Sequence, residues 1–175
     1  KKKKKHREIE MGFAIEVDSA TDARLEAYTS IREKDLTSGH GARFIVEGKV
    51  ALETALRRGR FALESVFLAE NRAAPLAELM ALVPENVPVY VAHQSVMDAV
   101  AGFPMHRGVL ACGLKGDIAE PAAFLAAIEA GPSTLLLMSD LSNHDNVGAC
   151  FRNAAAFGTD AVLMDGQCCD PLYRT

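Results

Sequence analysis

The sequence predicts an α/β fold in two parts, a small α/β/α sandwich followed by the first part of a second α/β domain. Two patterns indicate this fold class. Short apolar runs alternate with segments of helical spacing between residues 44 and 114. An apolar run, an alanine-rich helical segment and another apolar run then follow between residues 133 and 166. We expect a lead-in at 1–20, a first domain at 21–117, a linker at 118–132 and part of the second domain at 133–175.

The composition is that of a globular protein that can bury a core. Of the 175 residues, 49% are apolar. The chain has no apolar run of about eighteen residues, and the lysines at 1–5 lead into charged residues instead of the apolar region of a signal peptide. We therefore expect a cytoplasmic protein with no membrane partner.

The charges are unevenly distributed along the chain. The net charge of −4 gives no general attraction to nucleic acid. Of the 19 Lys and Arg residues, however, fifteen lie at or before Arg72. The lysine run at 1–5 is either an arm that binds phosphate or a solvated tail.

The cysteines and histidines do not predict a metal site. None of the four cysteines has Cys-x-x-Cys spacing, and the five histidines are scattered. Cys168 and Cys169 are adjacent, which suits a single tetrahedral metal poorly. We expect reduced thiols and no metal. For His144, before the last predicted helix, both loop packing and a catalytic role remain open.

The first regular element expected in the first domain is a short amphipathic helix. Within the lead-in, which we expect to be poorly ordered, residues 13–17 have the composition of a short strand. Asp22 is then placed to cap a helix over 21–36, whose apolar face includes Leu25 and Tyr28.

A strand at 44–48 and a helix at 49–58 come next. Arg57, Arg58 and Arg60 cluster where this helix ends, and they either complement the helix dipole or contact the phosphates of a nucleic acid. The remaining elements expected in the first domain are a strand at 63–68, a helix at 75–82, a strand at 87–91, a helix at 95–101 capped by Ser95, and a strand at 108–114.

The last part of the sequence predicts a strand, a helix and a second strand. Before it, the linker contains a helix at 122–130 with Pro121 in the first position. The strand from 133 is followed by a helix of about three turns. We expect Asn146 to be its N-cap and Gly158 to be its left-handed stop.

Spacing on this helix separates two faces. Gly148 and Arg152 share one face, whereas Val147, Phe151 and Ala154 lie together on another. An arginine among small residues near the carboxyl end of a strand lets a ligand approach closely. The same arginine can instead form a salt bridge with the next strand. Spacing alone leaves both interpretations open.

The motif on this helix resembles the first motif of the SpoU (TrmH-like) RNA ribose methyltransferases of the SPOUT superfamily. Asn146, Gly148 and Arg152 form its Asn-x-Gly-x-x-x-Arg pattern, and Ala-Ala-Ala-Phe-Gly at 154–158 and Asp-Pro-Leu-Tyr-Arg at 170–174 resemble its continuation. Earlier in the chain, Phe-Ile-Val-Glu-Gly at 44–48 and Gly-Phe-Pro-Met-His-Arg-Gly-Val-Leu-Ala at 102–111 are similar to segments of the RNA-binding domain that many SpoU proteins carry. The resemblance implies an RNA-binding sandwich followed by the start of an α/β-knot methyltransferase domain.

The implied activity is transfer of a methyl group from S-adenosylmethionine to a ribose 2′-hydroxyl of ribosomal or transfer RNA, by a homodimer joined through the methyltransferase domain. Arg152 matches the family's catalytic arginine, and Asn146 would position the loop or the ribose, with helix capping as an equal role. A guanidinium loses its proton only above about pH 12. We therefore expect Arg152 to orient a phosphate and stabilise negative charge on the ribose oxygen instead of acting as a base.

The resemblance also implies contacts between RNA and the first domain. We expect a structural role for Glu47, although it too matches a family position. The residues expected to contact RNA phosphates are Arg43, Arg57, Arg58 and Arg60.

The family's second and third motifs, which supply most of the cofactor pocket, would lie beyond Thr175. Two parallel strands and one helix cannot bury both faces of a sheet. We therefore expect the 175-residue chain alone to be inactive. It is either part of a longer polypeptide or a non-catalytic RNA-binding relative. The apolar residues expected to lack a covering layer are Leu135, Leu137, Val162 and Leu163.

A third interpretation, a dinucleotide-binding unit with Asp165 as its acidic residue, is disfavoured. Of the Gly-x-Gly-x-x-Gly pattern, only Gly148 is present. The cofactor-binding residues and the target nucleotide are not assigned by the sequence.

Overall fold

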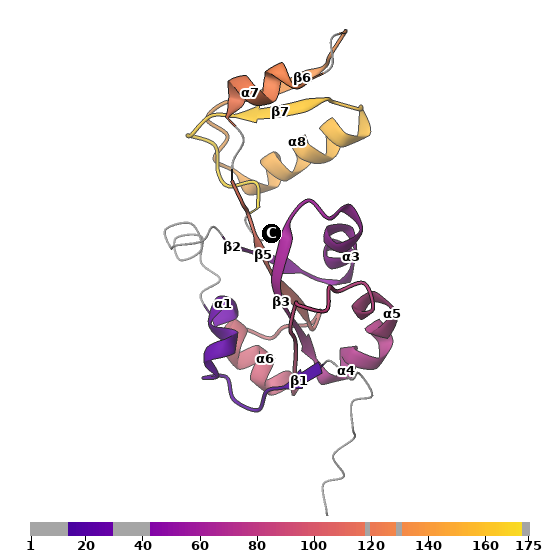
Figure 1. The fold of residues 1–175 in the computed structure, drawn as a ribbon. Helices are drawn as coiled ribbons and strands as arrows, with labels where there is room; N and C mark the ends of the chain where they lie inside the picture. Colours follow the sequence, from indigo (N-terminus) through magenta and orange to yellow (C-terminus); the bar gives the residue numbers. More distant parts are fainter. Residues whose placement is uncertain (1–13, 30–42, 118–119, 129–130, 173–175) are drawn as a thin grey trace, which may run out of the picture. The chain divides into compact units, whose positions relative to one another are not determined.

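The computed structural model describes residues 14–29, 43–117, 120–128 and 131–172. These residues form two compact units, the first ending at Gly116 and the second beginning at Asp117 (Figure 1). Each unit has its own sheet, with five strands in the first and two in the second among the described residues.

The first unit is built on a mixed sheet in the order β1-β4-β3-β5-β2. Strands β1, β4 and β3 run parallel, whereas β5 is antiparallel to both of its neighbours, β3 and β2. The carboxyl ends of all strands except β5 therefore lie at one edge of the sheet. The strands are β1 (Ala14–Glu16), β2 (Arg43–Glu47), β3 (Ala62–Ala69), β4 (Val89–Ala92) and β5 (Val109–Leu114).

Both faces of this sheet are covered by apolar packing. Side chains alternate between the faces, so Phe67 and Ala69 of β3 belong to one core, while Val66 and Leu68 point to the other side. All four are fully buried. Coverage on both sides explains why β3 is a nearly continuous apolar run in the sequence.

One face packs against α1 (Glu26–Thr29) and α6 (Gln94–Ala101) (Figure 1). The Tyr28 ring lies on Phe67 with ring centroids 5.3 Å apart, and its hydroxyl is 2.7 Å from Ser65 Oγ. Because Tyr28 is fully buried, this hydrogen bond satisfies a hydroxyl that would otherwise be costly to bury.

The other face packs against α3 (Lys49–Arg58), α4 (Glu70–Ala73) and α5 (Ala77–Met80) (Figure 1). Here the Phe44 ring of β2 crosses directly over Gly113 of β5. A Cβ at position 113 would lie 2.4 Å from the ring, so only glycine allows this approach.

The start of the first unit differs from the prediction. Residues 14–16 are the edge strand of the sheet, paired in parallel with Val89–Val91, and Val17 is buried. The unit therefore begins before residue 21, and the expected poorly ordered lead-in is wrong for residues 14–17. The short strand expected at 13–17 is confirmed for residues 14–16, and residue 13 lies outside the described residues. Its pairing with a strand far along the chain is what no local pattern reveals.

Two helix predictions also need correction or qualification. Helix α6 is capped by His93 and not by Ser95, because His93 Nδ1 accepts the Ser95 amide at 3.2 Å. The predicted cap Asp22 is confirmed by a 2.9 Å bond from the Arg24 amide. The helix expected at 21–36 is observed as a 3₁₀ turn and α1, and its part beyond residue 29 lies outside the described residues.

The second unit consists of two parallel strands and two helices. Helix α8 (His144–Ala156) connects β6 (Leu135–Met138) to β7 (Ala161–Met164) (Figure 1). Helix α7 (Pro121–Ala126) lies in the segment expected to be a linker, has Pro121 in its first turn as predicted, and belongs to this unit. The predicted strand–helix–strand order is confirmed.

The small sheet of the second unit is incompletely covered. Of the three α8 residues that spacing places on one face, Val147 and Ala154 are buried and Phe151 is partly buried. Leu135 and Leu137 are 47% and 72% exposed, which confirms the expectation for these two residues. Val162 and Leu163 were also expected to lack a covering layer, but both are partly buried.

Candidate functional site

The predicted motif occupies the loop after β6 and the first turns of α8. Asn143 is the N-cap, and its Oδ1 accepts the Asn146 amide at 3.0 Å. The prediction that Asn146 caps the helix is therefore wrong, because a cap at Asn143 lets the helix begin two residues before Asn146. Asn146 is the third residue of α8, with an exposed side chain. Gly158 has φ +66° just beyond the helix, which confirms the predicted stop.

The Arg152 side chain lies over Gly148. A Cβ at position 148 would be 3.2 Å from Arg152 Nη1, so the shared face predicted from spacing is confirmed. Arg152 is exposed, and it forms no hydrogen bond or ion pair with the described residues. The alternative of a salt bridge to the next strand is not observed. The donors of this guanidinium are therefore open to an external anion.

Asn146 and Arg152 do not share one face of α8. They are six residues apart, which places them about 120° apart around the helix axis. A single ligand atom therefore does not contact both residues side by side. Their common feature is exposure on the same helix, with Asn146 in its first turn and Arg152 in its third.

The loops at the carboxyl ends of β6 and β7 are bonded to each other through Asp165. Its Oδ2 accepts the Ser139 hydroxyl at 2.5 Å, and its Oδ1 accepts the amides of Asp140, Gln167 and Cys168 at 3.3, 3.0 and 3.1 Å. These hydrogen bonds, with that from Ser139 contributing most, lower the pKa of Asp165 to about 2.

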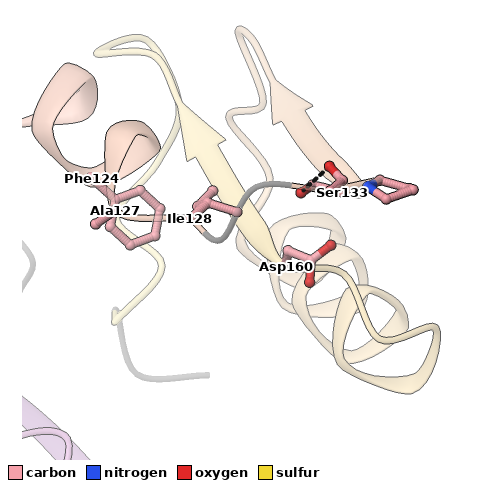
Figure 2. A pocket seen from close by; sticks show the side chains of 7 residues that line it. Phe124, Ala127, Ile128, Ser133 and Asp160 are labelled. Atoms are coloured by element: carbon pink, nitrogen blue, oxygen red, sulfur yellow. Dashed lines mark hydrogen bonds between the residues drawn. The ribbon is translucent and has the colours of Figure 1, made fainter.

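An open hollow of the second unit lies at the opposite edge of its sheet. Figure 2 shows Phe124, Ala127 and Ile128 facing it, with Ser133 and Asp160 on the other side. Ser133 and Asp160 precede β6 and β7, so the hollow is at the amino ends of these strands and away from the motif. Asp160 is already bonded there, accepting the Thr134 amide at 2.7 Å.

The four arginines predicted to contact RNA fall into two pairs. Arg43 donates two hydrogen bonds to the Glu64 carboxylate, at 2.6 and 2.7 Å, and Arg57 donates one to the Glu53 carboxylate at 2.9 Å. Arg58 is exposed and has no carboxylate partner among the described residues.

Arg60 lies over an aromatic ring at the edge of the sheet where β3 begins. Its guanidinium is 5.2 Å from the centroid of Phe61, which packs edge-on against Phe44 at 5.0 Å. This edge carries the amino ends of β2 and β3, because Arg43 and Ala62 both pair with Leu114. Exposed cations beside an aromatic ring suit the phosphates and bases of a nucleic acid.

Glu47 lies at the opposite edge from these arginines. It ends β2, and Arg107 Nε is 3.9 Å from its Oε1. The Arg107 side chain also lies on Gly48, at 3.2 Å from where a Cβ would stand. Arg107 belongs to the His-Arg-Gly segment singled out in the sequence, but the spacing did not indicate its partner.

Sequence reasoning missed the roles of Asn143 and Asp165. The segment 139–146 is rich in Ser, Asp and Asn, so several residues compete for the cap, and the capping preference does not choose between Asn143 and Asn146. The bonds of Asp165 to Ser139 and Asp140 had no local signal, because these partners are 26 and 25 residues away.

Two negative findings apply to the described ranges 14–29, 43–117, 120–128 and 131–172. They contain no group of three or more His, Cys, Asp or Glu side chains that could hold a metal ion. No helix in these ranges is long and apolar enough to cross a membrane.

Comparisons with known proteins agree with the resemblance seen in the sequence. Residues 45–112 match the family model described as RNA 2′-O ribose methyltransferase substrate binding. An uncharacterized tRNA/rRNA methyltransferase of Mycobacterium tuberculosis is 36% identical over 157 residues, covering 87% of this chain and 52% of the relative. A 23S rRNA (guanosine-2′-O-)-methyltransferase of Pseudomonas syringae pv. tomato is 33% identical over 124 residues, covering 68% of this chain and 49% of the relative. The chain thus spans about half the length of the curated relatives it matches.

Solved structures share the fold. An AdoMet-bound rRNA methyltransferase from Sinorhizobium meliloti superimposes with a TM-score of 0.71 at 17% identity, covering 93% of this chain and 58% of that one. An RNA 2′-O ribose methyltransferase superimposes with a TM-score of 0.60 at 20% identity, covering 87% and 56%. These structures show the shared fold, and the family model and the relatives show that the chain belongs to the SpoU (TrmH-like) family.

Proposed function

We propose that the protein transfers a methyl group from S-adenosylmethionine to a ribose 2′-hydroxyl of ribosomal or transfer RNA, in the cytoplasm and as a homodimer joined through the second unit. The observation that carries this proposal is the position and exposure of Arg152. It lies exposed over Gly148, without a partner among the described residues, at the matching position of a family motif. The relatives named as RNA methyltransferases support the same conclusion.

The reaction assigns Arg152 a role in charge stabilisation. When bound, S-adenosylmethionine would supply an activated methyl group to the ribose 2′ oxygen. The 2′ oxygen gains negative charge as its proton leaves for solvent or a neighbouring phosphate. The Arg152 guanidinium can donate two parallel hydrogen bonds to that phosphate and stabilise the negative charge on the 2′ oxygen. Asn146, exposed two residues before Gly148, would hydrogen-bond the ribose or hold the approaching loop.

The residues described at the motif edge do not by themselves fit the cofactor. Three backbone amides there are already bound by Asp165, and the hollow described above lies at the other edge of the sheet. Leu137 is largely exposed where an enclosing wall would be needed. We therefore assign no residue of this chain to cofactor binding and expect the 175-residue chain alone not to bind S-adenosylmethionine.

RNA binding by the first unit is proposed at the arginine cluster of α3. Since Arg43 and Arg57 are held by carboxylates, we expect Arg58 and Arg60 to contribute most, with the other two contributing less. The Phe61 ring beneath Arg60 offers a surface on which a base can stack.

Methyl transfer by the polypeptide expressed from the whole reading frame tests the catalytic proposal. Arg152→Ala should abolish turnover without loss of fold, and Arg152→Lys should restore little of it because the bidentate fork is lost. The matched control is Asn153→Ala, an exposed neighbour on the same helix outside the proposed site. Near-normal turnover by either Arg152 variant would remove this residue from the mechanism. Absence of turnover in the unaltered protein would favour a non-catalytic RNA-binding relative.

Titration of structured RNA against the chain at several salt concentrations tests the proposed RNA surface. Arg58→Ala with Arg60→Ala should weaken binding and reduce the slope of log affinity against log salt by about two, one for each lost phosphate contact. Arg24→Ala is the control, because its guanidinium is held by Asp22. An unchanged slope in the double variant would move the RNA contact elsewhere.

A further inference from the structure

The Asp165 carboxylate accepts several hydrogen bonds, from side-chain and backbone donors. Four donors from two loops converge on it: the Ser139 hydroxyl and the amides of Asp140, Gln167 and Cys168. Two of these donors belong to the loop after β6 and two to the segment after β7. A single side chain therefore fixes the separation of the two loops at the motif edge.

Further bonds reinforce the same junction. The Cys168 thiol donates to the Met138 carbonyl at 3.4 Å, and its sulfur accepts the Leu141 amide at 3.5 Å. The Cys169 amide donates to the Leu141 carbonyl at 2.9 Å. The segment 165–169 is thus bonded along the loop that leads from β6 toward α8.

The backbone of this loop is held in an unusual conformation. Asp140 has φ +54°, and among the described residues it is the non-glycine residue with positive φ. Side chains rarely adopt that region, so the conformation persists where surrounding bonds impose it. The Asp140 amide bonds to Asp165, which places the carboxylate at the point where the strained turn is held.

We propose that Asp165 is a positioning residue for the α8 site: it holds the loop 139–143, whose last residue caps α8, and thereby sets where Asn146 and Arg152 stand. This inference rests on the proposed function. It assigns no proton transfer to Asp165, although a carboxylate at the carboxyl edge of a sheet is a usual place for a general base. A carboxylate whose lone pairs are committed to four donors is a poor base, in agreement with its lowered pKa.

Cys168 offers a direct readout of the clamp in the 175-residue chain. Its rate of alkylation by iodoacetamide, followed residue by residue by mass spectrometry, reports how often the segment 165–169 opens. Asp165→Ala should raise this rate about tenfold or more, since four hydrogen bonds are lost and two of them cross between the loops. The alkylation rates of Cys150 on α8 and of buried Cys112 in the first unit should stay unchanged, showing that the helix and the first unit remain folded.

Two milder variants keep the test valid if Asp165→Ala opens the whole unit, which a parallel rise at Cys150 would show. Asp165→Asn keeps one oxygen for the backbone amides, and Ser139→Ala removes one donor only. Both should raise the Cys168 rate by less than about threefold. A Cys168 rate within twofold of the unaltered chain in Asp165→Ala would overturn the clamp.

Steady-state kinetics of the polypeptide from the whole reading frame separate positioning from a general role in folding. Asp165→Ala should lower kcat by about 10- to 100-fold, because small displacements of a catalytic group are costly. The KM for RNA should change little, since the proposed RNA contacts lie in the first unit. Asp165→Asn should restore most of kcat, which it would not do for a general base.

The outcomes distinguish this inference from the function on which it rests. Full turnover in Asp165→Ala, together with loss of turnover in Arg152→Ala, would overturn positioning and leave the proposed function standing. Failure of Asp165→Asn to restore kcat would also overturn it, in favour of a role that needs the charge. No turnover in the unaltered protein would remove the proposed function and the positioning role with it, while the alkylation rates would still decide whether the clamp exists.

Discussion

The two units use the same local pattern, an apolar strand followed by a helix and another strand, with different results. In the first unit, helices cover both faces of the sheet, and Val66, Phe67, Leu68 and Ala69 of β3 are all fully buried. In the second, Leu137 of β6 is 72% exposed. A strand that is apolar on both sides forms a core only where both sides are covered.

The difference also changes what holds each unit together. The first unit depends on apolar burial, which contributes in proportion to the area removed from water. The second buries few large side chains, and its motif edge is held by hydrogen bonds to one partly buried carboxylate, that of Asp165. Such bonds fix geometry, but each contributes little net stability.

The largest expected effect is a difference in independent folding. A fragment of residues 1–116 should unfold cooperatively on heating, whereas a fragment of 117–175 should show no cooperative transition, because one face of its sheet is exposed. Circular dichroism of both fragments, with limited proteolysis of the whole chain, measures this. A fragment of 21–116, which lacks β1 and Val17, serves as control and should be less stable than 1–116. Cooperative unfolding of 117–175 would contradict the comparison.

Matched truncations of one large side chain in each unit should differ sharply. Phe67→Ala removes a fully buried ring and should lower the free energy of unfolding by about 3–5 kcal/mol. Leu137→Ala removes an exposed side chain and should change it by less than about 0.5 kcal/mol. Urea denaturation of the two variants gives both values.

Leu137→Lys extends the same test to association. If the exposed face of β6 promotes self-association, the lysine variant should sediment with less aggregate than the unaltered chain. A cost of several kcal/mol for Leu137→Ala would show instead that this face is covered in solution.

A pair of glycine substitutions sharpens the comparison at smaller scale. Gly113→Ala places a Cβ 2.4 Å from the buried Phe44 ring and should cost about 1–3 kcal/mol of stability. Gly166→Ala meets nothing within 4 Å and should stay within about 0.5 kcal/mol. Urea denaturation again provides the values. Adding Phe44→Leu should recover part of the loss at position 113, and no recovery would point to a cause other than this contact.

The smallest expected effect is the pH dependence of the second unit. The hydrogen bonds lower the pKa of Asp165 from its usual 3.8 to about 2. Because the folded-state pKa is lowered, the contribution of this carboxylate is fully present above about pH 4 and is lost as the pH falls through about 2. The Gln167 and Cys168 amide signals followed by NMR should therefore titrate near pH 2. In Asp165→Asn this step should disappear, and a midpoint near pH 4 would show that the bonds do not form in solution.

Much of the fold follows from spacing within short segments. Helix α3 falls at the predicted residues 49–58, β5 begins within one residue of its prediction, and Gly148 and Arg152 share a face as expected. These features depend on the helical and strand periods, which are local properties of the chain. The arginine cluster at the end of α3 was visible for the same reason, but the sequence did not show that Glu53 holds Arg57 of this cluster or that Glu64 holds Arg43 of β2.

What the sequence determined by itself was therefore the order of elements, the faces of α8 and the motif that marks the family. The tertiary structure decided that residues 14–16 pair with β4, that Asn143 and not Asn146 caps α8, and that Asp165 joins two loops. Each of these choices selects one partner among several chemically equivalent candidates, at Asp165 across about 25 residues of chain. Hydrogen-bonding groups are common along any sequence, and which of them meet is decided only when the strands pair and bring their loops together.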